Sequence, residues 1–252
     1  MPLSLNFNSF SLFFNRYFSP KCLILHPSIN HIDMNEIEIT ADGSATLYVP
    51  HLNEHYHSVK GALTESLHIF RDCAFLHHPI TSHPLRILEI GFGTGLNAVV
   101  TAMAADKSHP THYISLELYP VEYDMIEKLN YGKIVDNDLL TFLHHAPWET
   151  ATTITPYFTL EKRKCDFTKC QLPDNIDVVY FDAFAPEKQP EMWSEELFAR
   201  IFAAMAPGAI LTTYCAKGEI RRRLQHIGFT VERIPGPPLG KREILRATKP
   251  PK

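Results

Sequence analysis

Residues 86–95 constrain the fold of this chain more than any other segment, because they read Arg-Ile-Leu-Glu-Ile-Gly-Phe-Gly-Thr-Gly. The apolar run predicts a buried strand. The three alternating glycines predict a tight turn, since glycine adopts a positive φ angle without a steric penalty. Residues 96–105 predict a helix directly after the turn. A strand, a glycine turn and a helix N-terminus together form a cradle for a nucleotide-like ligand.

The spacing of the glycines leaves the kind of ligand open, and a plain turn without a ligand is a further alternative. Counted from Gly91, the dinucleotide fingerprint G-x-G-x-x-G/A ends on Leu96 and fails. Counted from Gly93, it ends on Ala98 and fits. The acid ahead of the glycines favours another class, because Glu-x-Gly-x-Gly-x-Gly resembles the loop of S-adenosylmethionine-dependent methyltransferases. The resemblance implies a cofactor site at Glu89, Gly91, Gly93 and Gly95.

Residues 111–117, Thr-His-Tyr-Ile-Ser-Leu-Glu, predict a second strand that closes on an acid. Glu117 follows the glycines by about 20 residues, the interval at which a carboxylate binds the hydroxyls of a ribose. A carboxylate suits this role because it accepts two hydrogen bonds at once. Dinucleotide enzymes and methyltransferases both use such an acid, so Glu117 predicts a nucleoside ligand without choosing between the two classes.

Strands and helices alternate along the rest of the chain, which predicts an α/β fold with a mostly parallel sheet and helices on both faces. Strands are expected at residues 86–90, 111–117, 177–182, 208–214, 229–234 and 243–247 with a strand pair at 152–165, and helices at 58–76, 96–105, 138–145, 191–205 and 217–227 and after Pro120. Ligands of such sheets bind beyond the carboxyl ends of the strands. The acids expected there are Glu89, Glu117, Asp166 and Asp182.

The pattern divides the chain into three parts. Residues 1–33 are rich in Phe, Ser and Asn without a period, so a poorly structured segment is expected and Met34 is the expected biological start. Residues 34–80 predict an extension made of a hairpin, with its turn at Asp42-Gly43, and a helix. Residues 81–252 are expected to form the Rossmann-like domain. No segment is long and apolar enough to span a membrane. A cytoplasmic protein is expected from the cysteine usage described next.

Cysteine and histidine usage argues against a disulfide framework and against a metal site. The five cysteines are an odd set without a C-x-x-C pair, which indicates reduced thiols. His51 and His55 have the spacing of helical metal ligands, but Pro50 and Asn53 indicate a loop. Neither a cysteine nor an acid cluster completes a site, so no metal is expected.

Basic residues are concentrated near the C-terminus. The net charge is −4, yet residues 217–252 hold ten basic and three acidic residues, a local balance of +7 that leaves −11 for the rest. Such asymmetry predicts one basic face on an acidic body, as in nucleic-acid binders. A solvated helix face is the alternative for a short run such as Arg221-Arg222-Arg223.

The segment that begins at Asp182 carries the acid that points to chemistry. Residues 182–186, Asp-Ala-Phe-Ala-Pro, are loosely similar to the (Asp/Asn)-Pro-Pro-aromatic loop of methyltransferases that modify amino nitrogens. Such a nitrogen must present its lone pair in line with the methyl–sulfonium bond. An acceptor at its N–H fixes that geometry and stabilises the developing charge. A helix N-cap is the alternative role for Asp182.

Residues 182–193, Asp-Ala-Phe-Ala-Pro-Glu-Lys-Gln-Pro-Glu-Met-Trp, resemble the signature D-x-F-A-P-x-x-x-P-x-M-W. This signature belongs to the methyltransferase half of the bifunctional tRNA 5-methylaminomethyl-2-thiouridine biosynthesis enzymes (MnmC) and to their stand-alone relatives (MnmD). The resemblance covers about residues 35–248. Further matching motifs are Ser58 with Gly61 and Glu65, residues 88–97, Arg221-Arg222-Arg223-Leu224 and Gly240-Lys241-Arg242-Glu243.

The resemblance implies a class I S-adenosylmethionine-dependent methyltransferase that acts on the aminomethyl nitrogen of 5-aminomethyl-(2-thio)uridine at the wobble position of tRNA. It implies Asp182 as the catalytic acid and the anticodon stem-loop of tRNA as the partner. Asp166 is the expected adenine ligand, although residues 155–171 match the family only loosely. The substrate-binding residues expected are Glu65, Phe184, Arg221, Arg222, Lys241 and Arg242. The chain is too short for the flavin-dependent oxidase half, so no oxidase activity is expected.

Two other functions stay open at this point. A methyltransferase of a small-molecule or protein amine would use the same core, although the basic C-terminal segment favours RNA. A non-catalytic tRNA-binding module is the second, although the intact glycine loop and Asp182 argue against it. Trp193 likewise has two interpretations, a platform for base stacking or a packed anchor at a helix start.

Overall fold

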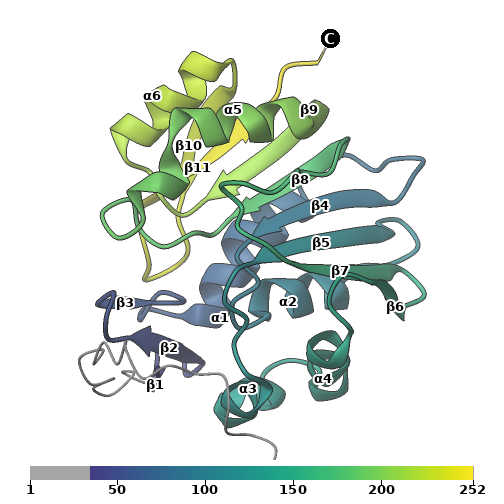
Figure 1. The fold of residues 1–252 in the computed structure, drawn as a ribbon, viewed down its shortest axis with the longest axis vertical. Helices are drawn as coiled ribbons and strands as arrows, with labels where there is room; N and C mark the ends of the chain where they lie inside the picture. The colour runs from purple at the N-terminus through teal and green to yellow at the C-terminus, as the bar shows by residue number, and fades with distance from the viewer. Residues whose placement is uncertain (1–34, 252) are drawn as a thin grey trace, which may run out of the picture. The chain divides into compact units, whose positions relative to one another are not determined.

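The computed structural model describes residues 35–251, in which helices cover both faces of an eight-stranded sheet (Figure 1). The strand order is β10-β11-β9-β8-β4-β5-β7-β6. These strands are β4 (Leu85–Ile90), β5 (Thr111–Glu117), β6 (Ala151–Thr155), β7 (Phe158–Lys164), β8 (Ile176–Phe181), β9 (Met205–Thr213), β10 (Thr230–Pro235) and β11 (Glu243–Thr248). The expectations for residues 1–33 and for Met34 lie outside the described residues.

The middle of this sheet is parallel and its edges are antiparallel. β9, β8, β4, β5 and β7 run parallel to one another in that order. β6 pairs antiparallel with β7, and β11 pairs antiparallel with both β9 and β10. The chain continues from β4 to β5 on one side and places β8 on the other, so the strand order reverses at β4. Such a reversal opens a ligand crevice beyond the carboxyl ends of the strands.

Side chains of the parallel strands alternate between two cores. In β4, Ile87 belongs to the core that includes η1 and α2, whereas Leu88 belongs to the core that includes α5 and α6 on the other face. The strands are apolar on both sides because helices cover both faces. The helices are α1 (Ala62–Glu65), η1 (Ser66–Phe75), α2 (Leu96–Ala104), α3 (Tyr123–Lys128), η2 (Asn130–Lys133), α4 (Asn137–His145), η3 (Pro190–Trp193), α5 (Glu195–Ala204) and α6 (Gly218–Ile227).

A small antiparallel sheet precedes the main sheet, as the hairpin pattern predicts. Its strands are β1 (Glu36–Ile39), β2 (Ala45–Val49) and β3 (Glu54–His55) in that order. The Asp42 carboxylate accepts hydrogen bonds from the Ser44 and Thr64 backbone amides at 3.0 and 2.9 Å, which ties the hairpin turn to α1. Burial raises the pKa of Asp42, but its hydrogen bonds outweigh burial and hold the pKa below the usual range.

The helices differ in detail from the sequence-based expectation. The helix expected at 58–76 begins at Ala62, and its residues 66–75 have the wider π-type hydrogen bonding. The helix expected at 191–205 is divided at Ser194, whose hydroxyl caps α5 by accepting from the Leu197 amide. Within residues 35–251, no helix is long and apolar enough to cross a membrane, and no group of three His, Cys, Asp or Glu side chains is placed to hold a metal.

Candidate functional site

The glycine loop joins β4 to α2, and each of its glycines has a positive φ angle. The φ values are 92° at Gly91, 50° at Gly93 and 74° at Gly95. A Cβ atom on Gly93 would lie 2.9 Å from the Tyr56 ring, and one on Gly95 would lie 2.7 Å from His144 Nε2. Glycine is therefore required at both positions, and the bare backbone lies at the N-terminus of α2, where helix amides lack intrahelical partners.

Glu117 orders this loop from the end of β5. Its Oε2 accepts from the Gly93 amide at 3.0 Å, and its Oε1 accepts from the Tyr119 amide at 2.8 Å. Each carboxylate oxygen has a second lone-pair site. Glu117 therefore retains acceptor capacity for two further donors, such as the hydroxyls of a ribose.

Two histidines hold Thr94 in the centre of the loop. His57 Nε2 lies 2.8 Å from the Thr94 hydroxyl, and His144 Nε2 lies 3.1 Å from the Thr94 carbonyl oxygen. A ring nitrogen that faces a carbonyl oxygen carries the hydrogen, so His144 donates. Burial lowers the pKa of each histidine to about 4, because desolvation disfavours the charged form. No sequence motif marked either histidine for this role.

A buried lysine supports the same loop from β7. Lys162 is 1% exposed, and its ammonium donates to the His144 carbonyl oxygen at 2.7 Å. Its Nζ also lies 5.3 Å from the ring centroid of Phe92 in the loop and 4.9 Å from that of Trp148, within the range of a cation–π contact. Burial lowers the pKa of Lys162 to about 8. Lys162 thus joins the end of α4 to the glycine loop, and the sequence patterns did not indicate this.

A buried polar cluster connects β4 with Asp182. Glu89 is fully buried, and its Oε2 accepts from the Ser115 hydroxyl at 2.6 Å. Asn97 on α2 donates from Nδ2 to Asp182 Oδ2 at 2.9 Å. Among the described residues, Glu89 Oε1 and Asn97 Oδ1 have no hydrogen-bond partner. Burial raises the pKa of Glu89 to about 8, so its carboxyl is mostly protonated at neutral pH and can donate a hydrogen bond.

A cavity of about 240 Å³ opens beside Asp182 at the carboxyl edge of the sheet. Asp182, Glu65 and Lys241, which lie far apart in the sequence, meet in its walls, and Phe184 lies beside them. These walls come from the region of β3, the first helix, the loops after β8 and β9, and the loop before β11. The lining residues are Glu54, His55, Tyr56, His57, Ser58, Val59, Glu65, Asp182, Ala183, Phe184, Ala185, Tyr214 and Lys241.

Opposite charges face one another in this cavity. Burial and the nearby Glu65 carboxylate raise the pKa of Asp182 to about 7, against the opposing effects of Asn97 and Lys241. Burial also raises the pKa of Glu65. Lys241 Nζ lies 3.8 Å from the ring centroid of Tyr214, and burial lowers the pKa of Lys241. Tyr214 belongs to no sequence motif, so sequence reasoning missed it.

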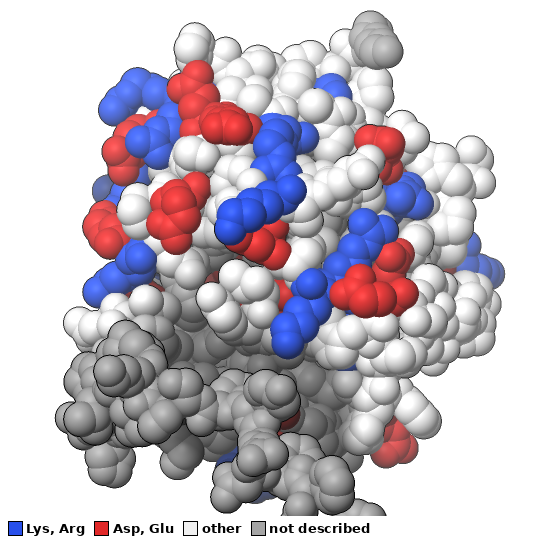
Figure 2. Space-filling view, viewed as in Figure 1, with Lys and Arg blue, Asp and Glu red and all other residues white. Residues whose placement is uncertain are grey.

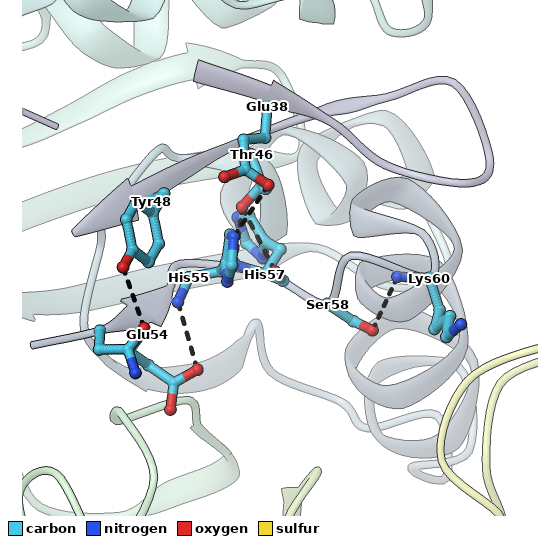
Figure 3. Close-up of polar contacts among 9 residues, drawn as sticks. Glu38, Thr46, Tyr48, Glu54, His55, His57, Ser58 and Lys60 are labelled. Atoms are coloured by element: carbon cyan, nitrogen blue, oxygen red, sulfur yellow. Dashed lines mark hydrogen bonds and ion pairs between the residues drawn. The ribbon is translucent and has the colours of Figure 1, made fainter. Parts of the chain in front are cut away.

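The segment around β3 forms another wall of the cavity. Thr46 on β2 accepts from the His57 backbone amide at 3.0 Å, as Figure 3 shows. This contact holds the segment that carries Tyr56, whose ring lies edge-on to Phe184 with 5.2 Å between centroids. Tyr56 therefore lies between Phe184 in the cavity wall and Gly93 in the glycine loop. No sequence motif predicted this position.

Asp166 is used within its own turn. Its Oδ1 accepts from the Thr168 amide at 2.9 Å and from the Thr168 hydroxyl at 2.6 Å, and Lys169 Nζ lies 2.9 Å from its Oδ2. Hydrogen bonds from Thr168 and Lys169 lower the pKa of Asp166 to about 2. The turn follows β7 and lies beside β5, because the Cys165 amide donates to the Glu117 carbonyl oxygen at 3.0 Å. An adenine contact of Asp166 stays a prediction.

Trp193 is a packed anchor, and the stacking interpretation is wrong for it. The side chain is fully buried, and its Nε1 donates to the Phe184 carbonyl oxygen at 2.8 Å. Its ring packs edge-on against Phe181 with 4.9 Å between centroids. Trp193 thus fixes the backbone of the signature loop, whereas the half-buried Phe184 lines the cavity.

The basic residues of the C-terminal part have different roles. Arg223 donates to the Trp193 carbonyl oxygen at 2.8 Å, so it supports the signature loop. Arg222 and Arg242 are exposed, and Arg221 is half-buried. Figure 2 shows Lys and Arg interspersed with Asp and Glu on this side of the molecule, so this side is not uniformly basic. Ion pairs contribute to this mixing: Arg233 with Glu243, and Arg246 with Glu232.

Comparison with known proteins confirms the family resemblance. Residues 156–250 match a family described as S-adenosyl-L-methionine-dependent methyltransferase. The chain is 30% identical over 203 residues to the tRNA 5-methylaminomethyl-2-thiouridine biosynthesis bifunctional protein MnmC of Cupriavidus necator, and 30% identical over 208 residues to that of Pseudomonas syringae pv. tomato. These matches cover 75% and 76% of this chain but 31% of each relative, so the chain spans about a third of their length.

Solved structures confirm the fold. MnmC2 from Aquifex aeolicus is similar with a TM-score of 0.63 and 25% identity, over 87% of this chain and 73% of that one. Spermidine synthase from Thermotoga maritima has a TM-score of 0.52 at 14% identity, over 90% of this chain and 84% of that one. The α/β fold predicted from the alternation of strands and helices, and the class I methyltransferase fold implied by the resemblance, are therefore confirmed.

Proposed function

We propose, since the chain belongs to the MnmC-like S-adenosylmethionine-dependent methyltransferases, that it methylates the aminomethyl nitrogen of 5-aminomethyl-(2-thio)uridine at the wobble position of tRNA. The product is 5-methylaminomethyl-(2-thio)uridine, and the anticodon stem-loop is the partner. The observation that carries the proposal is the cavity in which Asp182, Glu65 and Lys241 meet, and Tyr56 in its wall lies against Gly93 of the glycine loop. We also propose a cytoplasmic location.

The residues of the glycine loop fit an adenosyl cofactor. The φ angles at Gly91, Gly93 and Gly95 are positive, so the tight loop needs glycine, and it brings the N-terminus of α2 to the carboxyl end of β4, where nucleotide-like ligands bind. Glu117 retains lone pairs for ribose hydroxyls, and Glu89 Oε1 is a buried oxygen without a partner among the described residues. S-adenosylmethionine bound there would supply a methyl group on a positive sulfonium sulfur, and an amine lone pair that attacks the methyl carbon would release the sulfur as a neutral thioether.

Asp182 prepares the substrate nitrogen. A primary amine arrives mainly as an ammonium ion, which has no lone pair. With a pKa of about 7, the Asp182 carboxylate can accept one ammonium proton near neutral pH and later release it to water through the open side of the cavity. Asn97 fixes this carboxylate by donating to Oδ2, so Oδ1 is left for the amine. The N–H groups that remain on the substrate amine can donate hydrogen bonds to the site, and these would orient the nitrogen.

The charges of the cavity favour a cationic amine. The carboxyl groups of Glu54, Glu65 and Asp182 line it together with one cation, Lys241. An ammonium group gains Coulomb energy from this excess of carboxylates, whereas an anionic group such as a carboxymethyl arm is repelled. The same observation favours a second candidate function, methylation of a small-molecule polyamine.

The test is transfer of labelled methyl groups to tRNA that carries 5-aminomethyluridine, with wobble-unmodified tRNA and spermidine as alternative acceptors. Label only in the modified tRNA is expected. Label in spermidine but not in tRNA would support the second candidate. Calorimetry with S-adenosylmethionine and its demethylated product provides the independent check, because absence of binding would overturn both functions.

A further inference from the structure

The loop before β11 contains a turn with a leucine where the backbone favours glycine. The Gly240 amide donates to the Pro237 carbonyl oxygen at 3.0 Å, which closes a four-residue turn. Leu239, the third residue of this turn, has a φ angle of 61°. A positive φ at this position defines a type II turn, which normally places glycine or asparagine there. An L-residue with a branched side chain is strained in this conformation.

Packing of the Leu239 side chain does not compensate for this strain. It is 84% exposed, more than any other large hydrophobic side chain among the described residues. The turn itself is anchored, because Pro237 is buried and the Gly236 amide donates to the Arg242 carbonyl oxygen at 3.0 Å. His68 Nε2 also lies 2.9 Å from the Pro235 carbonyl oxygen. A rigid turn therefore presents a single apolar side chain to the solvent.

This turn borders the cavity. Lys241, two residues after Leu239, lines the cavity together with Asp182, and its Nζ lies over the Tyr214 ring. Two trans peptide units keep the Cα atoms of Leu239 and Lys241 within about 7.6 Å of each other. Arg242, the next residue, is exposed and can contact a phosphate. Leu239 thus lies beside the cavity in which the proposed function places the wobble nucleotide.

We propose that Leu239 is a wedge that fills the stacking position vacated in the anticodon loop when the target uridine turns into the cavity. The inference rests on the proposed function and adds a positioning residue to it. A base that leaves its stack exposes the apolar faces of its neighbours to water, and proteins cover such faces with apolar side chains, leucine among them. The hydrogen-bonded turn already holds the backbone that presents the side chain to the solvent, so little backbone freedom is lost on binding.

The variant Leu239→Gly separates this role from a structural one. Glycine relieves the strain at a φ of 61°, so the melting temperature should stay equal or increase. Because the contact of the leucine with the neighbouring bases is lost, KM for a modified anticodon stem-loop should increase by about tenfold. Methylation of the free nucleoside 5-aminomethyluridine and the affinity for S-adenosylmethionine should not change. Ile80→Ala, at another exposed apolar side chain ahead of β4, is the matched control.

A fluorescent base reports the insertion directly. In a stem-loop with 2-aminopurine next to the modified uridine, binding of the wild-type protein should change the fluorescence, and Leu239→Gly should abolish most of that change while Ile80→Ala keeps it. Equal KM and equal fluorescence in wild type and Leu239→Gly would overturn the wedge even if the tRNA is methylated. If the wild-type protein does not methylate the modified tRNA, the proposed function is overturned instead. If the wild type dimerises and Leu239→Gly does not, with an unchanged KM, the leucine is a contact between copies and the wedge is rejected.

Discussion

Lowering the pH should loosen the glycine loop, because two histidines hold it in their neutral form. His57 and His144 both contact Thr94, and burial lowers the pKa of each from 6.5 to about 4. Between these two values, the unfolded chain binds a proton at each histidine and the folded chain does not. The free energy of unfolding therefore decreases as the pH falls from 6.5 towards 4.

The size of this effect follows from the two pKa values. Moving from about pH 7.5 to about pH 5 should cost about 2 kcal/mol per histidine, or about 4 kcal/mol for the pair. Glu89 and Asp182 act in the opposite direction, because burial raises their pKa values to about 8 and about 7. Their folded carboxyl groups hold protons that the unfolded chain has lost, so they favour folding as the pH falls. The contribution of the histidines must therefore be measured as the difference in pH dependence between the wild type and a variant that lacks them.

Glutamine in place of each histidine keeps an N–H donor near the position of Nε2 but removes the titration. Urea unfolding of the wild type and of the double variant His57→Gln with His144→Gln, at about pH 7.5 and about pH 5, measures the difference. The wild type should lose about 4 kcal/mol more than the variant. His51→Gln, at an exposed position, is the control and should match the wild type. Equal pH dependence of wild type and double variant would refute the reasoning.

Further substitutions test the rest of the site. Asp182→Asn should lower kcat by about 10²- to 10⁴-fold with unchanged cofactor affinity in calorimetry, and a lost affinity would assign Asp182 to the cofactor instead. Gly93→Ala should prevent cofactor binding, because a Cβ would lie 2.9 Å from Tyr56 and the φ of 50° costs about 1–2 kcal/mol; normal binding in equilibrium dialysis would contradict this. Lys162→Met removes a hydrogen bond to the His144 carbonyl oxygen and should cost about 1.5–3 kcal/mol in urea unfolding, whereas an unchanged midpoint would show that the contact is dispensable.

Local patterns were sufficient to predict the order of elements and one row of acids. Apolar runs, glycines and acids are neighbours in the chain, so periodicity located β4, β5 and β8 and placed Glu89, Glu117 and Asp182 at their ends. The same patterns did not indicate how the basic residues near the C-terminus are paired. Ten basic residues near the C-terminus predicted one basic face, which stays a prediction, and some of these residues form ion pairs, such as Arg246 with Glu232.

The amino-acid sequence alone determined the parallel α/β architecture and the glycine loop, because short-range sterics and hydrophobic periodicity act between neighbouring residues. Only the tertiary structure decided how the acids are used: it brought Lys241 from the C-terminal loop and Glu65 from the first helix to Asp182. It also buried Lys162 against the loop and turned Trp193 inward. Burial and contacts between residues that are distant in the sequence set the pKa values in the cavity, and no local pattern in the chain contains them.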